Sequence, residues 1–504
     1  MMYTFPNKFR NFTFVLMALG LIGLSYGFLV APKTVEEAQE MVANAHGDGH
    51  GDGHGGAANG HGEVATSHGD SHQNESHHQE VTEHGKAQDE NIHHDAGVGH
   101  TTSHGEDESH NNISAHDDAH GESAAAHGSE HGHDDEHAKH VFNQLKNKPW
   151  AALYVAAFFF MMISLGVLAF YAIQRAAQAG WSPILYRVME AITGYLLPGT
   201  LIVFFILLLS GMHLNHLFIW MDPEVVAHDE LIRGKVGYLN VPFFLARALF
   251  YIAGWSAYRY FSRKFSLAQD NAPSGDISSH KINFRISAAF LVFYIVTESM
   301  MSWDWIMSID PHWFSTLFGW YVFASMFVSG ITVIAMMTIY LKSKGYLEFV
   351  NDSHIHDLGK FMFAISVFWT YLWFSQFMLI WYSNIPEEVT YFITRIEDYQ
   401  IPFFGMLVMN LLFPFLVLMN SDYKRTNYFV IMVGIVILLG HYLDVFNMIM
   451  PSAVGDQWYI GFAEIGGFLF FLGLFLFVVF KELTKAPLLA KGDPYMGESE
   501  RFHY

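Results

Sequence analysis

The sequence has 504 residues, of which 52% are hydrophobic and 15% are charged, whereas about 25% are charged in a typical soluble domain. The formal net charge of −21 is concentrated, because 23 of the 48 acidic residues and 21 of the 30 histidines lie between Thr34 and His140. The rest of the chain lacks the polar residues that would cover a soluble core, which excludes a soluble globular protein. The charge therefore does not indicate a nucleic-acid partner. The absence of cysteine excludes cysteine-ligated iron–sulfur clusters and covalently attached c-type haem in this chain.

Ten apolar stretches are long enough to cross a hydrocarbon core, which takes about 20 residues of helix. Helix is the predicted conformation because a lipid-facing backbone must satisfy its own hydrogen bonds. The predicted fold class is therefore an all-α integral membrane protein of about ten transmembrane helices. The stretches are residues 12–30, 150–173, 194–219, 241–262, 284–308, 316–341, 360–384, 402–420, 428–450 and 458–481.

Lysine and arginine predict how the chain is oriented, because they gather on the cytoplasmic side of a membrane. Connections rich in Lys and Arg alternate along the chain with short ones that hold only Arg233, Lys235 and Arg395. Both termini are therefore predicted to be cytoplasmic, and the His-rich segment is predicted to lie outside. The first span is long for a signal peptide and no clear cleavage site follows it, which favours a retained anchor over a cleaved signal. The basic connections hold Lys8, Arg10, Arg175, Arg187, Arg259, Arg263, Lys264, Lys281, Arg285, Lys342, Lys344, Lys360, Lys424, Arg425, Lys481, Lys485, Lys491 and Arg501.

Residues 44–140 repeat His, Gly, Asp, Glu and Ser irregularly, with few aliphatic residues. Such a segment cannot bury enough apolar surface to become ordered, so it is predicted to be disordered. Its imidazoles and carboxylates suit zinc, copper or nickel. The alternative is a solvated linker, and because no fixed ligand spacing appears, no metal site is assigned.

Ionisable residues inside predicted spans are costly and mark candidate functional positions. His213 and His216 are three residues apart, as are His441 and Asp444, so each pair is predicted to share one helix face. All the candidates fall in the outer half of the membrane, where we expect one cluster that handles protons or a polar headgroup. The alternative is that each satisfies an interhelical hydrogen bond. The proton-handling or quinone-pocket candidates are His213, His216, Glu298, Asp304, Gln376, His441, Asp444 and Glu464, with Arg247 as a further ionisable residue.

The inner half of the predicted spans holds no acid or histidine. A proton path from the cytoplasm would need waters along its polar side chains, namely Thr193, Tyr195, Ser287, Ser329, Thr332 and Asn410. The histidines within the spans lack the paired spacing of a b-type cytochrome and are too few for a haem–copper oxidase. The sequence therefore argues against bound haem, and no catalytic residue is assigned.

Two segments resemble a known family. They are WDWIMSIDPHWFSTLFGWY at residues 303–321 and FSQFMLIWYSNIPEE at residues 374–388. Both are similar to membrane subunits of alternative complex III, within the polysulfide-reductase (NrfD-like) family. The resemblance covers about residues 145–485 and is greatest to the subunit described as quinone-binding subunit 2.

The resemblance implies two four-helix bundles, formed by spans two to five and six to nine and flanked by the first and last spans. The expected divisions are residues 1–33 (anchor), 34–145 (outer loop), 146–309 (first bundle), 310–455 (second bundle) and 456–504 (last span and tail). It also implies a place in a bacterial inner membrane, with the His-rich loop in the periplasm.

The same resemblance implies a quinol:cytochrome c oxidoreductase whose multihaem cytochrome c and iron–sulfur centres are separate chains. The other expected partners are a homologous NrfD-like subunit, membrane lipid and a terminal oxidase. No cofactor is bound covalently; quinone or quinol is the candidate ligand, with menaquinone and ubiquinone not distinguished. In such complexes the sister subunit is thought to hold the working quinol pocket.

The leading hypothesis is thus a non-haem respiratory subunit that handles protons. Two alternatives from other classes stay open: a divalent-metal or proton-coupled transporter fed by the His-rich loop, and a structural scaffold that docks partner subunits.

Overall fold

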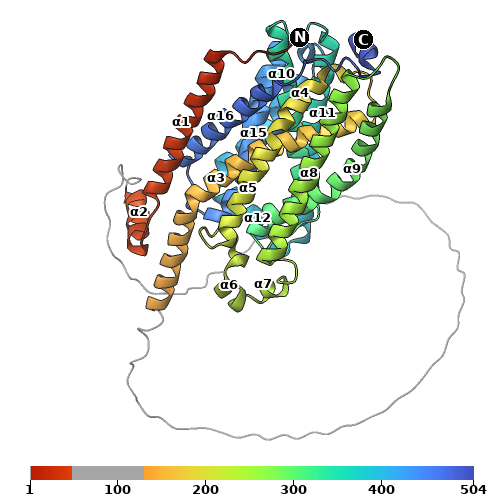
Figure 1. Ribbon diagram of the computed structural model, residues 1–504. Coiled ribbons are helices and arrows are strands. Elements are labelled where there is room, and N and C mark those ends of the chain that lie inside the picture. Colours follow the sequence, from red (N-terminus) through yellow and green to blue (C-terminus); the bar gives the residue numbers. More distant parts are fainter. Residues whose placement is uncertain (1, 48–129, 504) are drawn as a thin grey trace, which may run out of the picture. The chain divides into compact units, whose positions relative to one another are not determined.

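The computed structural model describes residues 2–47 and 130–503, and these residues form helices and connections with no strand (Figure 1). The helices are α1 (Asn7–Val30), α2 (Val35–Gly47), α3 (Glu130–Ala176), α4 (Tyr186–Ile192), α5 (Leu196–Gly211), α6 (Pro223–His228), α7 (Glu230–Gly234), α8 (Val241–Asp270), α9 (Ser278–Trp305), α10 (Phe318–Ser343), α11 (Asp352–Ser383), α12 (Pro386–Glu397), α13 (Gln400–Leu407), α14 (Phe413–Leu418), α15 (Asn427–Val454), α16 (Phe462–Leu483) and α17 (Met496–Glu500). A π-helical turn, Val408–Leu412, joins α13 to α14.

Nine helices within the described residues are long and apolar enough to cross a membrane. The predicted span at residues 241–262 lies in α8, which is not among the nine because Arg247 and several polar aromatic residues lower its hydropathy. Helix α8 nevertheless has 30 residues, which makes it about 45 Å long. Met2 pairs with Pro487, so the chain runs between the two ends of the bundle an even number of times, and α8 supplies the tenth pass. The predicted fold class, an all-α membrane protein, is confirmed.

The bundle has two ends that are used as landmarks below. The terminal end carries Met2 and Pro487, and the loop end carries α6, α7 and α12 (Figure 1). The margins of the predicted outer loop differ from expectation, because α2 occupies Val35–Gly47 and α3 begins at Glu130. The prediction of disorder for the remainder falls on residues 48–129, which lie outside the described residues.

The most deeply buried spans are α3 and α10, which begin the two predicted bundles. They approach closely at two glycines. A Cβ atom on Gly166 would lie 2.2 Å from the carbonyl oxygen of Met326, and one on Gly330 would lie 2.9 Å from the backbone nitrogen of Val167. Small residues permit such close packing in membranes, where dispersion contacts drive helix association. The α3–α10 contact thus joins the first bundle to the second.

Helices α8 and α9 are held together by side-chain hydrogen bonds along most of their length. Within the membrane-spanning part, Trp255 donates to Thr297 at 3.0 Å and Ser262 donates to Asn283 at 3.0 Å. Polar pairs of this kind stabilise helix contacts in lipid by about 0.6–2 kcal/mol each. We interpret this series of pairs as structural, because the polar groups of the two helices satisfy one another.

Helix α1 packs on α16 through glycines from both helices. A Cβ atom on Gly466 would lie 2.6 Å from the backbone nitrogen of Leu24 and 2.8 Å from the carbonyl oxygen of Gly20. Most of the remaining surface of α1 is exposed, including Ile22 and Leu29. Glycine at position 466 is therefore required for the two backbones to approach.

We predict that Gly466→Ala lowers the free energy of unfolding by about 1–3 kcal/mol, because the added methyl group overlaps the backbone of α1. Thermal unfolding in mild detergent measures the change. Gly234→Ala is the matched control, since no atom lies within 4 Å of the added Cβ. A silent Gly466→Ala would show that α1 does not pack on α16 in the mature protein, as expected of a cleaved signal peptide.

Candidate functional site

A carboxylate from α15, Asp444, lies fully buried at the centre of the second bundle and accepts hydrogen bonds from two other helices. Ser325 of α10 donates to Oδ2 at 2.8 Å, and the Trp369 indole of α11 donates to the same oxygen at 3.0 Å. The hydroxyl of Tyr321, also on α10, donates to Oδ1. Asp444 therefore brings α10, α11 and α15 together at one point.

His441 lies one turn before Asp444 on α15, and the two side chains form a pair. Its Nδ1 atom is 3.4 Å from Asp444 Oδ2 and 2.9 Å from Ser325 Oγ, while Nε2 has no partner. Among the described residues, His441 is the only basic side chain within ion-pair distance of Asp444. The pair therefore combines a carboxylate with an imidazole, a side chain that can both accept and donate a proton.

A small cavity lies between α12 and the helices α10, α11, α13 and α15. Its volume is about 10 Å³, and Tyr321 forms part of its wall. Helix α12 covers it: Tyr391 stacks on Trp313 with ring centroids 3.9 Å apart, and Arg395 donates from Nε to the carbonyl of Asn447 at 3.0 Å. Burial raises the pKa of the Tyr391 phenol, so this residue stays neutral. The lining residues are Tyr321, Trp373, Gln376, Tyr391, Phe392, Arg395, Phe403, Met406, Asn447 and Met448.

Asp304 lies in the first bundle and is held differently from Asp444. Arg247 of α8 donates to both of its oxygens at 2.8 Å, and the Tyr251 hydroxyl donates at 2.9 Å. A bidentate guanidinium compensates the carboxylate permanently, since arginine does not lose its proton in proteins. We interpret Asp304 and Arg247 as a structural ion pair.

Glu298 and Glu464 are buried, and each leaves its Oε1 atom without a partner. Glu298 lies on α9. Glu464 lies in the first turn of α16, where Oε2 accepts the backbone N–H of Gly461 at 2.8 Å. Lys148 of α3 is near enough to interact with the charge of Glu464. Glu464 thus has a structural role as a helix cap.

The prediction that His213 and His216 share a helix face is wrong, because α5 ends at Gly211. His213 has φ +59° and is exposed just beyond the helix end, and the backbone of His216 pairs with the side chain of Asn147 at 2.9 and 3.0 Å. Burial and the Lys146 charge lower the pKa of His216, which favours its neutral form. Neither histidine contributes to the centre at Asp444.

The eight candidates therefore occupy several separate places instead of one cluster. Gln376 lines the same cavity as Tyr321, and Tyr321 donates to Asp444. Gln376 is therefore linked to the His441–Asp444 pair through Tyr321. Sequence reasoning missed the other members of this site, Tyr321, Ser325, Trp369, Arg395 and Asn447. A signal existed for Arg395, because Val389, Phe392, Ile393 and Ile396 in residues 386–397 have the spacing of an amphipathic helix.

The expectation that the cytoplasmic half of the spans holds no acid is also wrong, because Glu190 is buried in α4 near the terminal end. The third span begins at Pro183, earlier than predicted, and so includes this residue. Glu190 accepts from Arg187 at 2.5 Å and from the Tyr171 hydroxyl at 3.1 Å. Arg187 also contacts Asp270 at 2.5 Å.

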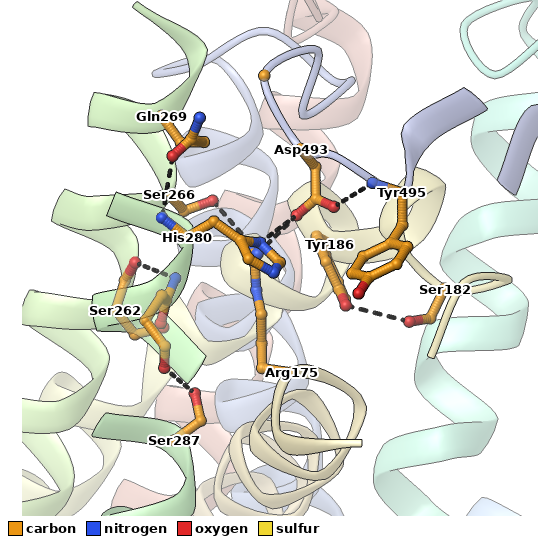
Figure 2. Close-up of polar contacts among 12 residues, drawn as sticks. Arg175, Ser182, Tyr186, Ser262, Ser266, Gln269, His280, Ser287, Asp493 and Tyr495 are labelled. Carbon is orange, nitrogen blue, oxygen red and sulfur yellow. Dashed lines mark hydrogen bonds and ion pairs between the residues drawn. The ribbon is translucent and has the colours of Figure 1, made fainter. Parts of the chain in front are cut away.

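The C-terminal tail completes this network at the terminal end. Figure 2 shows the side chains of Arg175 and His280 directed at the carboxylate of Asp493, at 2.7 and 3.6 Å. Burial alone would raise the pKa of Asp493, but the His280 ring and the Arg175 charge outweigh it and hold the pKa below its usual value. Farther along, Ser499 donates to the carbonyl of Trp181 at 2.6 Å. The network therefore fixes the tail over the ends of α3, α8 and α9.

The metal-binding interpretation of the His-rich segment falls mostly on residues outside the described part of the chain. Within residues 2–47 and 130–503, no group of three His, Asp or Glu side chains is arranged to hold a metal ion.

Comparison with protein-family models and with curated protein sequences finds no match for this chain. The helices and their burial define it as a multi-pass helical membrane protein. Its more specific function is therefore argued from the site.

Proposed function

We propose that this chain is a non-haem membrane subunit of a respiratory quinol:cytochrome c oxidoreductase complex, and that it handles protons at the His441–Asp444 pair. The observation that carries the proposal is the burial of a histidine and a carboxylate 3.4 Å apart with no permanent cation within ion-pair distance in the described chain. Such a pair can hold one proton on either residue. Intramembrane ionisable groups of this kind are typical of proton relays.

The two segments that resemble the NrfD-like family support the proposal by their places in the fold. Residues 303–321 supply Tyr321, which donates to Asp444, and Trp313, which stacks on α12. Residues 374–388 supply Gln376, which lines the cavity next to Tyr321. Tyr321 and Gln376, one from each segment, thus line the same cavity.

The second bundle is a better candidate for proton handling than the first. The carboxylate of Asp304 is neutralised by a bidentate arginine, so releasing or taking up a proton there would first require breaking an ion pair. Asp444 has no such partner, and its neighbour His441 can itself carry the proton.

Quinone is not placed in this cavity. A volume of about 10 Å³ holds about one water molecule and is far too small for a quinone ring. We therefore assign the chain a proton-handling role and place no quinol in this cavity, which agrees with the division of labour that the resemblance implies.

Gentle solubilisation of native membranes, with a tag at the carboxyl terminus, tests the proposal. We expect a multihaem cytochrome c to co-purify, giving a reduced c-type haem spectrum and quinol:cytochrome c activity. The haem must come from another chain, because this one has no cysteine to attach it. A colourless polypeptide that stays alone in several mild detergents would contradict the proposal and favour a transporter. Co-purification with non-haem proteins alone would favour a scaffold.

A further inference from the structure

Four of the side chains that line the cavity below α12 each leave one buried polar atom without a partner. They are Arg395 Nη2, Trp373 Nε1, Gln376 Oε1 and Asn447 Oδ1. Arg395, Gln376 and Asn447 are 3%, 4% and 2% exposed. Unpartnered polar groups are rare in protein interiors, so their convergence on one small space requires an explanation.

The assignment of the Asn447 amide is fixed by its other contacts. Its Nδ2 atom donates to the carbonyl of Pro402 at 3.0 Å and to the sulfur of Met406 at 3.2 Å. The atom left over is therefore the acceptor oxygen. Arg395 is fixed in the same way, since its Nε and Nη1 atoms already donate to the carbonyls of Asn447 and Tyr391.

The four atoms comprise two donors and two acceptors. Guanidinium and indole N–H groups only donate, and the two amide oxygens accept. A water molecule accepts two hydrogen bonds and donates two, so one water matches this set. The cavity volume of about 10 Å³ is also close to the minimum that one buried water requires.

We propose that the cavity is a binding site for one ordered water, held by Arg395, Trp373, Gln376 and Asn447. The water would bridge Arg395 of α12 to Trp373 and Gln376 of α11 and to Asn447 of α15. It would supply the hydrogen-bond partners that these four groups lack within the protein. Tyr321 lies in the same wall and donates to Asp444, so the water site lies next to the Asp444 centre. The water site does not depend on the proposed function.

Radiolytic hydroxyl labelling of the purified protein, read by mass spectrometry, tests the site without measuring activity. Radicals form from bound water inside a protein and oxidise the nearest thioethers. Met406 and Met448 line the cavity, although they are only 1% and 4% exposed. Met161 and Met162 of α3 are fully buried and do not line it. We expect Met406 and Met448 to be oxidised several-fold faster than Met161 and Met162; equal, slow rates would overturn the proposal.

A substitution identifies the residues that hold the water. Gln376→Leu removes an acceptor at nearly constant volume, so oxidation of Met406 and Met448 is expected to fall toward the rate of Met161. Asn410→Leu is the matched control, because Asn410 is also a buried amide with unpartnered atoms but does not line the cavity. Unchanged oxidation in Gln376→Leu would contradict the assignment, whatever the activity of the complex. If Gln376→Leu does not fold, the comparison within the native protein still decides whether the site holds water.

Discussion

Replacing Asp444 with asparagine is expected to lower proton-coupled turnover of the complex by about 10²-fold or more, which is the usual contribution of a positioned proton-transfer group. An amide cannot take up a proton as a carboxylate does. The substitution should be tolerated structurally. If the amide oxygen takes the place of Oδ2, it still accepts from Ser325 and Trp369, and the Tyr321 hydroxyl can turn to accept from the amide nitrogen.

The measurement is quinol-driven cytochrome c reduction, with proton release followed in parallel in reconstituted vesicles. Asp456→Asn is the matched control, because Asp456 is an exposed carboxylate just beyond α15. Turnover and proton release that stay at the native level in Asp444→Asn, in a complex of normal composition, would refute the role of the pair.

The second large effect is expected at Arg247. Replacing Arg247 with methionine should lower the free energy of unfolding by about 3–5 kcal/mol, because it leaves the buried carboxylate of Asp304 without a compensating charge. Adding Asp304→Asn to that variant should restore most of the loss, since the neutral amide can still accept from Tyr251.

A double-mutant cycle measured by unfolding in mild detergent gives the coupling between the two residues. Lys342→Met provides the control, because Lys342 pairs with Asp352 at 3.0 Å on an exposed surface and should contribute only about 0–1 kcal/mol. A coupling near zero between Arg247 and Asp304 would show that the ion pair does not compensate the buried charge.

These two substitutions separate two uses of a buried carboxylate in one chain. Asp304 has a permanent cation, Arg247, so removing that cation should reduce stability, whereas Asp444 has only His441, so replacing Asp444 should reduce proton transfer. A sequence pattern cannot make this distinction, because both residues are acids within apolar helices. The difference depends on which side chain the neighbouring helix presents.

The sequence by itself determined the helical class, the approximate position of each span and the placement of both termini at one end. These follow from local rules, because each span must be apolar over the thickness of the hydrocarbon core and must satisfy its own backbone. Only the tertiary structure decided which candidates meet. Tyr321 and Trp369 donate to Asp444 although they lie 123 and 75 residues away in the sequence. Helix α5 ends at Gly211, so His213 and His216 lie outside the span. The third span begins earlier than predicted and so includes the buried Glu190. Burial makes a polar group require a partner, but the partner is chosen by helix packing between distant segments, which no local pattern encodes.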